Sequence, residues 1–213
     1  MDDYTASSAI KPGFRNMRFS GIEIRDIVIA VVVLSISFTI ILARGNPTYF
    51  SNDTFTNIIY WFLISLILVM TSFMLHEFGH KFVAQKMGAW SEFRMYPVGL
   101  ILCLVLSAVA GILFAAPGAV YIRGELDKEM NGKISIAGPL VNLALGFLAF
   151  GLSMVTTGRT GAIFFLMANL NGFLAAFNML PIFPLDGSKI LKWNIPLYVI
   201  TLGAALILIY LTW

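Results

Sequence analysis

Long stretches of the chain carry no charged residue, and the charged residues gather in the short segments between them. Most of these stretches are near or beyond the roughly 20 residues that cross a bilayer as a helix. Without interruption by Asp, Glu, Lys or Arg they cover residues 27–43, 54–75, 95–122, 134–158, 160–185 and 193–213. This pattern predicts an all-α polytopic membrane protein with about six hydrophobic segments and five or six spans.

Composition supports the same class of protein. The chain is 59% hydrophobic and 12% charged, with a mean hydropathy of +0.86, whereas soluble domains carry about 25% charged residues. We therefore expect a basic N-terminal segment at residues 1–26 and one membrane domain at 27–213. The first segment has no cleavage signal, so residues 27–43 are interpreted as an uncleaved anchor. The bilayer is an expected partner, and nucleic acid is not.

Lysine and arginine predict the orientation, because they favour the cytoplasmic side of a membrane. Four basic residues precede the first apolar stretch, which places the N-terminus in the cytoplasm. The second stretch then returns the chain to that side, where Lys81, Lys86 and Arg94 follow. The expected location is the cell membrane, with several crossings and a cytoplasmic N-terminus.

Residues 95–122 have two interpretations. As a full crossing, they would leave eight basic residues inside and six outside. As a re-entrant segment they leave twelve inside and two outside, which fits the charge rule better. We therefore favour a helix-like part at 98–114, a turn and a β-like run ending at residue 122. The full crossing remains the alternative.

The sequence HEFGH at residues 76–80 contains both histidines of the chain. Four residues apart, His76 and His80 share one helix face and can bind one tetrahedral ion, while Glu77 reaches water at that ion. A buried hydrogen-bonded pair or a proton relay is the alternative. Ionisable residues in an apolar span are costly and usually functional, so we favour zinc.

Asp186 is the candidate for a third ligand. Catalytic zinc sites use three protein ligands and one open position, and the chain has no third histidine. Asp186 follows a long apolar stretch that ends in two prolines, where turn chemistry holds the carboxylate at a break in the backbone. The re-entrant interpretation places it on the same side as His76. A simple turn facing water is the alternative.

These motifs together resemble the site-2 protease family of intramembrane zinc metalloproteases, in its compact archaeal and bacterial form. HExxH on one helix, AGPLVN at 137–142 opening another and NMLPIFPLDG at 178–187 ending a third match the family's three-helix catalytic core, over roughly residues 55–192. The resemblance implies one zinc ion per chain. It implies His76, His80 and Asp186 as ligands, Glu77 as catalytic acid and base, and Asn178 as a contact to the substrate or the oxyanion.

The expected activity is hydrolysis of a peptide bond in or near the transmembrane segment of a membrane-protein substrate, as in regulated intramembrane proteolysis. Zinc would activate water, with Glu77 as general base and then acid. The alternative is a membrane metal-ion carrier or sensor with the same ligands, which would not need Glu77. A substrate helix must unwind, and the β-like runs 92–96 and 120–123 are candidates to receive it by strand addition; ordinary loops are the other interpretation.

Two further asparagines lie in the apolar stretches. For Asn171 we favour a hydrogen bond between helices, which membrane asparagines often make. For Asn142, in the AGPLVN sequence, a structural and a functional role are both open.

Overall fold

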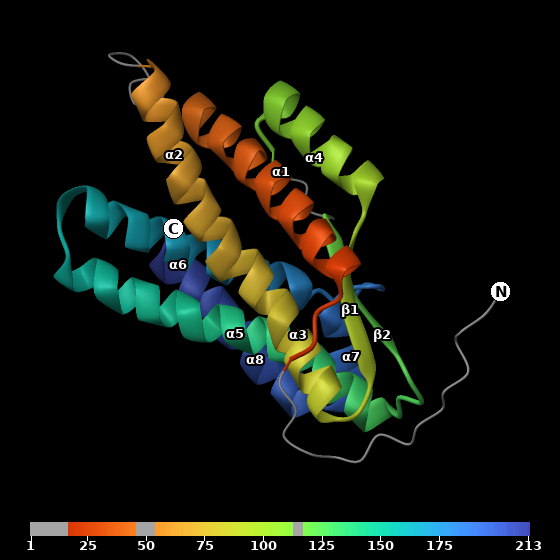
Figure 1. Ribbon diagram of the computed structural model, residues 1–213. Coiled ribbons are helices and arrows are strands. Elements are labelled where there is room, and N and C mark those ends of the chain that lie inside the picture. Colours follow the sequence, from red (N-terminus) through yellow and green to blue (C-terminus); the bar gives the residue numbers. More distant parts are fainter. Residues whose placement is uncertain (1–16, 46–53, 113–116) are drawn as a thin grey trace.

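A computed structural model describes residues 17–45, 54–112 and 117–213 of the chain (Figure 1). In these residues, helices predominate, and two short strands form the one sheet. In chain order the elements are α1 (Gly21–Gly45), α2 (Thr54–Val69), the π-helical turn η2 (Met70–Met74), α3 (Leu75–Lys86), β1 (Trp90–Met95), α4 (Pro97–Ala110), β2 (Gly118–Arg123), α5 (Lys128–Val155), α6 (Gly158–Asn178), α7 (Asp186–Trp193) and α8 (Ile195–Leu211).

Four helices of the described part are long and apolar enough to cross a membrane. They cover Gly21–Arg44, Phe55–Lys86, Lys128–Val155 and Gly158–Asn178, and the helices α4 and α8 are apolar but shorter. Many large aliphatic and aromatic side chains on these helices are exposed, as lipid-facing surfaces require. The predicted class, an all-α polytopic membrane protein, is confirmed.

The second spanning helix is built from three consecutive elements. α2, η2 and α3 follow one another without a break from Thr54 to Lys86. The π-helical turn buries Ser72 and Met74, directly before the HEFGH sequence in α3. Both histidines therefore lie on a regular α-helix, as their spacing predicts.

The two strands pair antiparallel, with Trp90 opposite Arg123 and Met95 opposite Gly118. The chain therefore leaves the sheet at the end of β1 and returns to the same place at the start of β2. Between them, α4 has 14 residues and a length of about 21 Å, below the ~30 Å of a bilayer core. This return favours the re-entrant interpretation of 95–122, of which residues 113–116 lie outside the described part.

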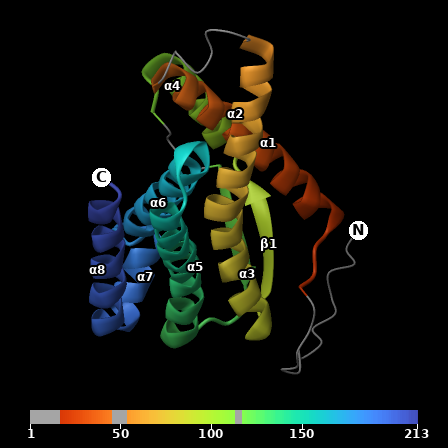
Figure 2. The ribbon, with the colours of Figure 1, turned by 90° about the vertical axis from the view of Figure 1, so that its left-hand side faces the viewer.

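α5 is the central helix of the C-terminal half, in contact with α3, α6, α7 and α8. Figure 2 shows the end of α3 and the start of α5 at the same end of the molecule, with the start of α2 at the opposite end. Figure 1 shows α1 beside α2, with α4 on the side of α1 away from α2. The sheet contacts α1 through β1 and contacts α3 through both strands. The sheet therefore lies between α1 and the helix that carries HEFGH.

Some helices begin earlier than the apolar stretches predict. α1 begins at Gly21 instead of residue 27, and α5 begins at Lys128 instead of residue 134, so the AGPLVN sequence lies inside α5 and does not open it. The Asp127 side chain accepts a hydrogen bond from the Met130 amide and caps α5. Hydropathy marks the apolar part of a helix, whereas capping decides its end. Of the predicted N-terminal segment, residues 1–16 lie outside the described part.

Candidate active site

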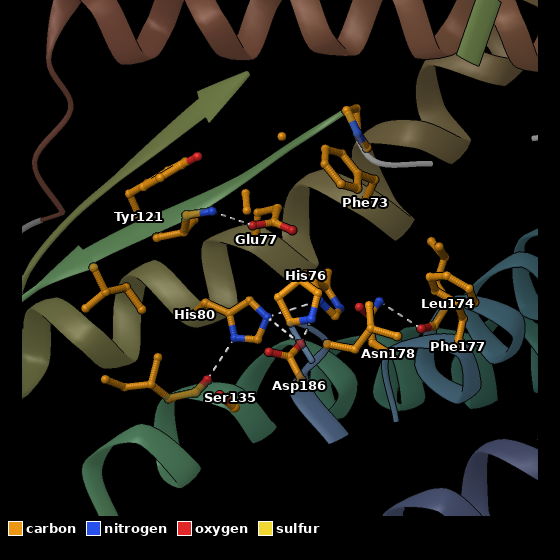
Figure 3. A pocket seen from close by; sticks show the side chains of 18 of the residues that line it. Phe73, His76, Glu77, His80, Tyr121, Ser135, Leu174, Phe177, Asn178 and Asp186 are labelled. Carbon is orange, nitrogen blue, oxygen red and sulfur yellow. Dashed lines mark hydrogen bonds and ion pairs between the residues drawn. The ribbon is translucent and has the colours of Figure 1, made fainter. Parts of the chain in front are cut away.

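Three side chains from two distant segments converge beneath the sheet, as Figure 3 shows for His76, His80 and Asp186. The Oδ2 atom of Asp186 lies 3.4 Å from Nε2 of His76 and 3.0 Å from Nε2 of His80. The two Nε2 atoms are 3.0 Å apart. Each side chain is nearly fully buried, so the three donors face one another away from bulk solvent.

These donors fit a zinc ion. Zinc binds imidazole nitrogen and carboxylate oxygen at about 2.0–2.2 Å, so tetrahedral ligand atoms lie about 3.3 Å apart. The three donor atoms of His76, His80 and Asp186 match this spacing and form one group that is able to hold a metal ion. Two imidazoles and one carboxylate leave a fourth position for water or substrate, as in catalytic zinc sites.

Hydrogen bonds on the far side of each imidazole set its orientation. Nδ1 of His80 lies 2.8 Å from the carbonyl oxygen of Ile134, and Nδ1 of His76 bonds the side-chain oxygen of Asn142. An acceptor at Nδ1 requires a proton there, which leaves the Nε2 lone pair free for a metal. Both rings are therefore held in the tautomer that binds zinc.

Asn142 is part of a buried polar network between three helices. Its amide nitrogen donates to the carbonyl of Ser72 at 2.7 Å and to the side-chain oxygen of Asn171 at 2.8 Å. Asn171 donates in turn to the Ser72 hydroxyl at 2.8 Å. Asn171 makes the interhelical bond that the sequence suggests, while Asn142 also orients a histidine. The sequence gives no signal for the part played by Ser72.

The backbone break before Asp186 is present as predicted. α6 ends at Asn178, and α7 begins at Asp186 after an irregular segment. The start of α7 packs closely on the end of α6, since a Cβ on Gly187 would collide with the Met179 carbonyl group. This contact holds the Asp186 carboxylate against α3, and Lys189 Nζ lies 3.8 Å from its Oδ1 atom.

Glu77 lies beside the three donors and points toward the sheet (Figure 3). Its Oε2 atom accepts a hydrogen bond of 2.9 Å from the backbone N–H of Val120 in β2. The side chain is buried and is not one of the three converging ligands. A carboxylate next to a metal position, held by one hydrogen bond, is placed to accept a proton from water.

A cavity of about 430 Å³ connects these groups. Its walls include both histidines, Glu77, Asp186, residues 118–122 of β2, and the aromatic side chains of Phe173 and Phe177 on α6. The lining thus includes the edge of a strand and aromatic side chains of α6.

Asn178 also lines this cavity, near the Asp186 carboxylate (Figure 3). Its amide nitrogen donates to the carbonyl of Leu174, four residues earlier in the same helix, at 3.0 Å. The predicted residue therefore lies at the site, with its donor directed along its own helix. A contact to substrate requires this amide to turn.

Gly138 on α5 permits the close approach of α5 to both histidines. A Cβ at this position would lie closer than 3.0 Å to the ring atoms of His76 and His80. The rings are fixed by their Nδ1 bonds and have nowhere to move. Gly138 lies within the AGPLVN sequence, but nothing in the sequence distinguishes it from the other glycines of the apolar stretches.

We expect Gly138→Ala to weaken zinc binding by about 10- to 100-fold, the effect typical of disturbing the groups that orient metal ligands. Zinc content after dialysis against buffered zinc measures this loss. Gly151→Ala on the same helix is the matched control, because a Cβ there meets nothing within 4 Å. Equal zinc affinity in the two variants would contradict the close packing.

Comparisons with known proteins identify relatives of one kind. A Methanocaldococcus jannaschii protein named "Putative zinc metalloprotease MJ0611" is 46% identical, over 83% of this chain and 87% of its own length. "Putative zinc metalloprotease YwhC" of Bacillus subtilis is 34% identical, over 62% of this chain and 68% of its own length.

A second M. jannaschii protein, "Zinc metalloprotease MJ0392", is 31% identical over 64% of this chain but only 35% of its own length. No protein-family profile matches the chain, and no solved structure matches it. Zinc is the metal in all three names, which agrees with the donors that converge in the structure. The chain belongs to the site-2 protease-like family of membrane zinc metalloproteases.

Proposed function

We propose that the protein is an intramembrane protease that cuts a peptide bond in or near the transmembrane segment of other membrane proteins. The observation that carries this proposal is the convergence of His76, His80 and Asp186, with Glu77 beside them, on helices that are apolar enough to cross a bilayer. A metal site recessed among such helices is reached more readily by a membrane segment than by a soluble protein.

The proposed chemistry is hydrolysis with one proton carrier. His76, His80 and Asp186 would hold a zinc ion, which would serve as a Lewis acid that polarises the peptide carbonyl and acidifies water. Glu77 takes a proton from the attacking water as the new C–O bond forms. It then gives that proton to the leaving nitrogen as the C–N bond breaks. Its burial near the cavity supports both roles.

Asn178 is the proposed donor to the developing oxyanion. A hydrogen-bond donor at a developing negative charge contributes substantially to catalysis of acyl transfer. Its position on the cavity wall supports this role. When the Asn178 side chain turns, its amide N–H gives up the Leu174 carbonyl and bonds the substrate. This N–H therefore has a hydrogen-bond acceptor both with and without substrate.

The substrate peptide is proposed to bind as a strand on the outer edge of β2. In an antiparallel pair, alternate residues direct their backbone groups away from the partner strand. The N–H of Val120 points outward, because it donates to Glu77 instead of to β1. An unwound substrate segment that pairs with this edge would lie along the cavity above Glu77.

We expect Ile122→Pro to raise the apparent KM for a transmembrane substrate by about 2- to 10-fold, the effect of one lost backbone hydrogen bond. Ile122 lies two residues beyond Val120 on the same strand edge and lines the cavity, whereas the N–H of Val120 is taken up by Glu77. Proline is tolerated where a strand's N–H faces away from its partner, so the sheet and the zinc content are expected to stay intact. Initial cleavage rates over a substrate series measure the change. Ile122→Ala keeps the N–H and is the control. An unchanged KM in the proline variant would exclude binding at this edge.

The proposed orientation places the N-terminus and the opening of the site in the cytoplasm, with several crossings of the membrane. Twelve of the fourteen basic residues then lie inside, and the return of the chain from β1 to β2 supports the re-entrant topology behind this count. The end of α3 and the start of α5, which carry Lys86 and Lys128, lie at one end of the molecule (Figure 2).

A direct test uses the purified protein in lipid vesicles with two substrates that share one scissile sequence. In the first substrate, the sequence lies at the end of a transmembrane helix, and in the second it lies in a soluble peptide. Intramembrane proteolysis predicts a much larger kcat/KM for the first. Preference for the soluble peptide would contradict the proposal while leaving the metalloprotease assignment intact.

A further inference from the structure

A second buried ionic group lies outside the metal site. Lys81 on α3 places its Nζ atom 2.8 Å and 2.9 Å from the two carboxylate oxygens of Glu23 on α1, and both side chains are 0% exposed. Both helices belong to candidate membrane spans. Buried ion pairs add little net stability, and intramembrane charges are usually functional, so this pair requires an explanation beyond helix packing.

The same pair covers the outer edge of β1. The backbone N–H of Phe93 donates to Glu23 Oε1 at 2.8 Å, and Lys81 donates to the carbonyl of Ser91 at 2.8 Å. Asp26, one turn further along α1, accepts from the N–H of Met95 at 3.4 Å. Exposed strand edges invite another strand. Here, side chains take up the outward groups of β1.

The contacts of β1 also affect β2, the strand that faces Glu77. Phe93 lies opposite Val120 in the antiparallel register, and Val120 is the residue whose N–H reaches Glu77. Lys81 follows His80 directly in the sequence. One continuous series of contacts therefore joins α1, the sheet and the helix that carries both histidines.

We propose that Glu23 and Lys81 are positioning residues for proteolysis: they close the outer edge of β1 and hold the sheet on α3, so that a substrate strand adds only to β2, over Glu77. This inference rests on the proposed function, since it concerns how the peptide is received. Glu23 has the central part, because its carboxylate bonds both the lysine and the strand.

The test compares two double variants that both remove the ion pair. Glu23→Leu/Lys81→Met leaves the Phe93 N–H without its acceptor, while Glu23→Gln/Lys81→Met retains an acceptor oxygen at that position. Replacing both charges avoids an uncompensated buried charge, which is the strongly destabilising case. A role limited to packing or charge neutralisation predicts equal behaviour in the two variants.

At equal zinc content, we expect the apparent KM for a transmembrane substrate to be about tenfold higher in the leucine variant than in the glutamine variant, with kcat within about twofold. Equal KM values would overturn the proposal. If the leucine variant does not fold, the same comparison is made with Asp26→Leu and Asp26→Asn at the next outward-facing amide of β1, that of Met95. We expect the KM to be higher in Asp26→Leu than in Asp26→Asn, by a smaller factor. Glu129→Gln/Lys133→Met removes an exposed ion pair and is the control.

Hydrogen exchange separates this inference from the proposed function. Backbone amides of residues 118–123 are expected to exchange faster in the leucine variant than in the glutamine variant, whether or not a substrate is cut. Unchanged exchange there would overturn the positioning role. A wild-type protein that cuts no membrane substrate, but shows the faster exchange in the leucine variant, would contradict the proposed function alone.

Discussion

Replacing Glu77 with Gln is expected to lower kcat by about 10²- to 10⁴-fold, the contribution typical of a general acid–base group, without loss of zinc. Glutamine keeps the size of the side chain and an oxygen that accepts the Val120 N–H, but it cannot carry the proton from water to the leaving amine. Cleavage of a transmembrane substrate and zinc stoichiometry are measured on the same preparation.

The control for Glu77→Gln is Glu129→Gln, which makes the same chemical change on an exposed part of α5 and is expected to leave kcat unchanged. Zinc uptake into vesicles is followed in parallel, because a metal-ion carrier with the same ligands would have no need of Glu77. Full cleavage by the Glu77→Gln variant would assign the proton transfer to another group. Zinc transport that is equal in this variant and the wild type, with no cleavage by either, would support the carrier.

Asp186→Ala is expected to lose zinc and, with it, all measurable hydrolysis. The Asp186 carboxylate is the donor that joins α7 to the two histidines on α3, at 3.4 Å and 3.0 Å from their Nε2 atoms. Disturbing the groups that orient metal ligands already weakens metal binding about 10- to 100-fold, so removal of a ligand is expected to exceed this range. Zinc content after dialysis measures the effect.

Asn178→Ala is the matched control for Asp186→Ala, because Asn178 lines the same cavity and is not one of the three converging donors. It is expected to retain one zinc ion per chain. Chelation of the wild-type protein should abolish cleavage, and added zinc should restore it. An Asp186→Ala protein that keeps zinc at wild-type affinity would show that the ion is held by other residues.

Hydropathy predicted the broad class of fold but not the ends of its helices. The apolar stretch beginning at residue 134 lies inside α5, which begins at Lys128 under the cap of Asp127. Residues 95–122 are apolar enough to suggest a span, yet the chain turns back after α4. The length of an apolar stretch does not distinguish a full span from a re-entrant segment. The chain returns here because β1, before α4, pairs with β2, after it.

Local periodicity explains why the candidate site was largely predictable. Residues four apart on a helix share a face, so the spacing of His76 and His80 was sufficient to bring the two rings together. The break before Asp186 was also local, since prolines and glycine mark it in the sequence. The sequence carried no comparable sign for Gly138, which matters because another helix passes close to it.

The sequence by itself determined the membrane class and the placement of the two histidines on one helix face, and it made Asp186 the candidate third ligand, because each of these depends on residue type and short spacing. Only the tertiary structure decided which atoms orient the imidazoles, which strand edge faces Glu77, and that Glu23 and Lys81 form a buried pair. Those contacts join segments that are distant in the chain. Their partners are selected by how helices pack in three dimensions, and no repeat or spacing along the chain encodes that packing.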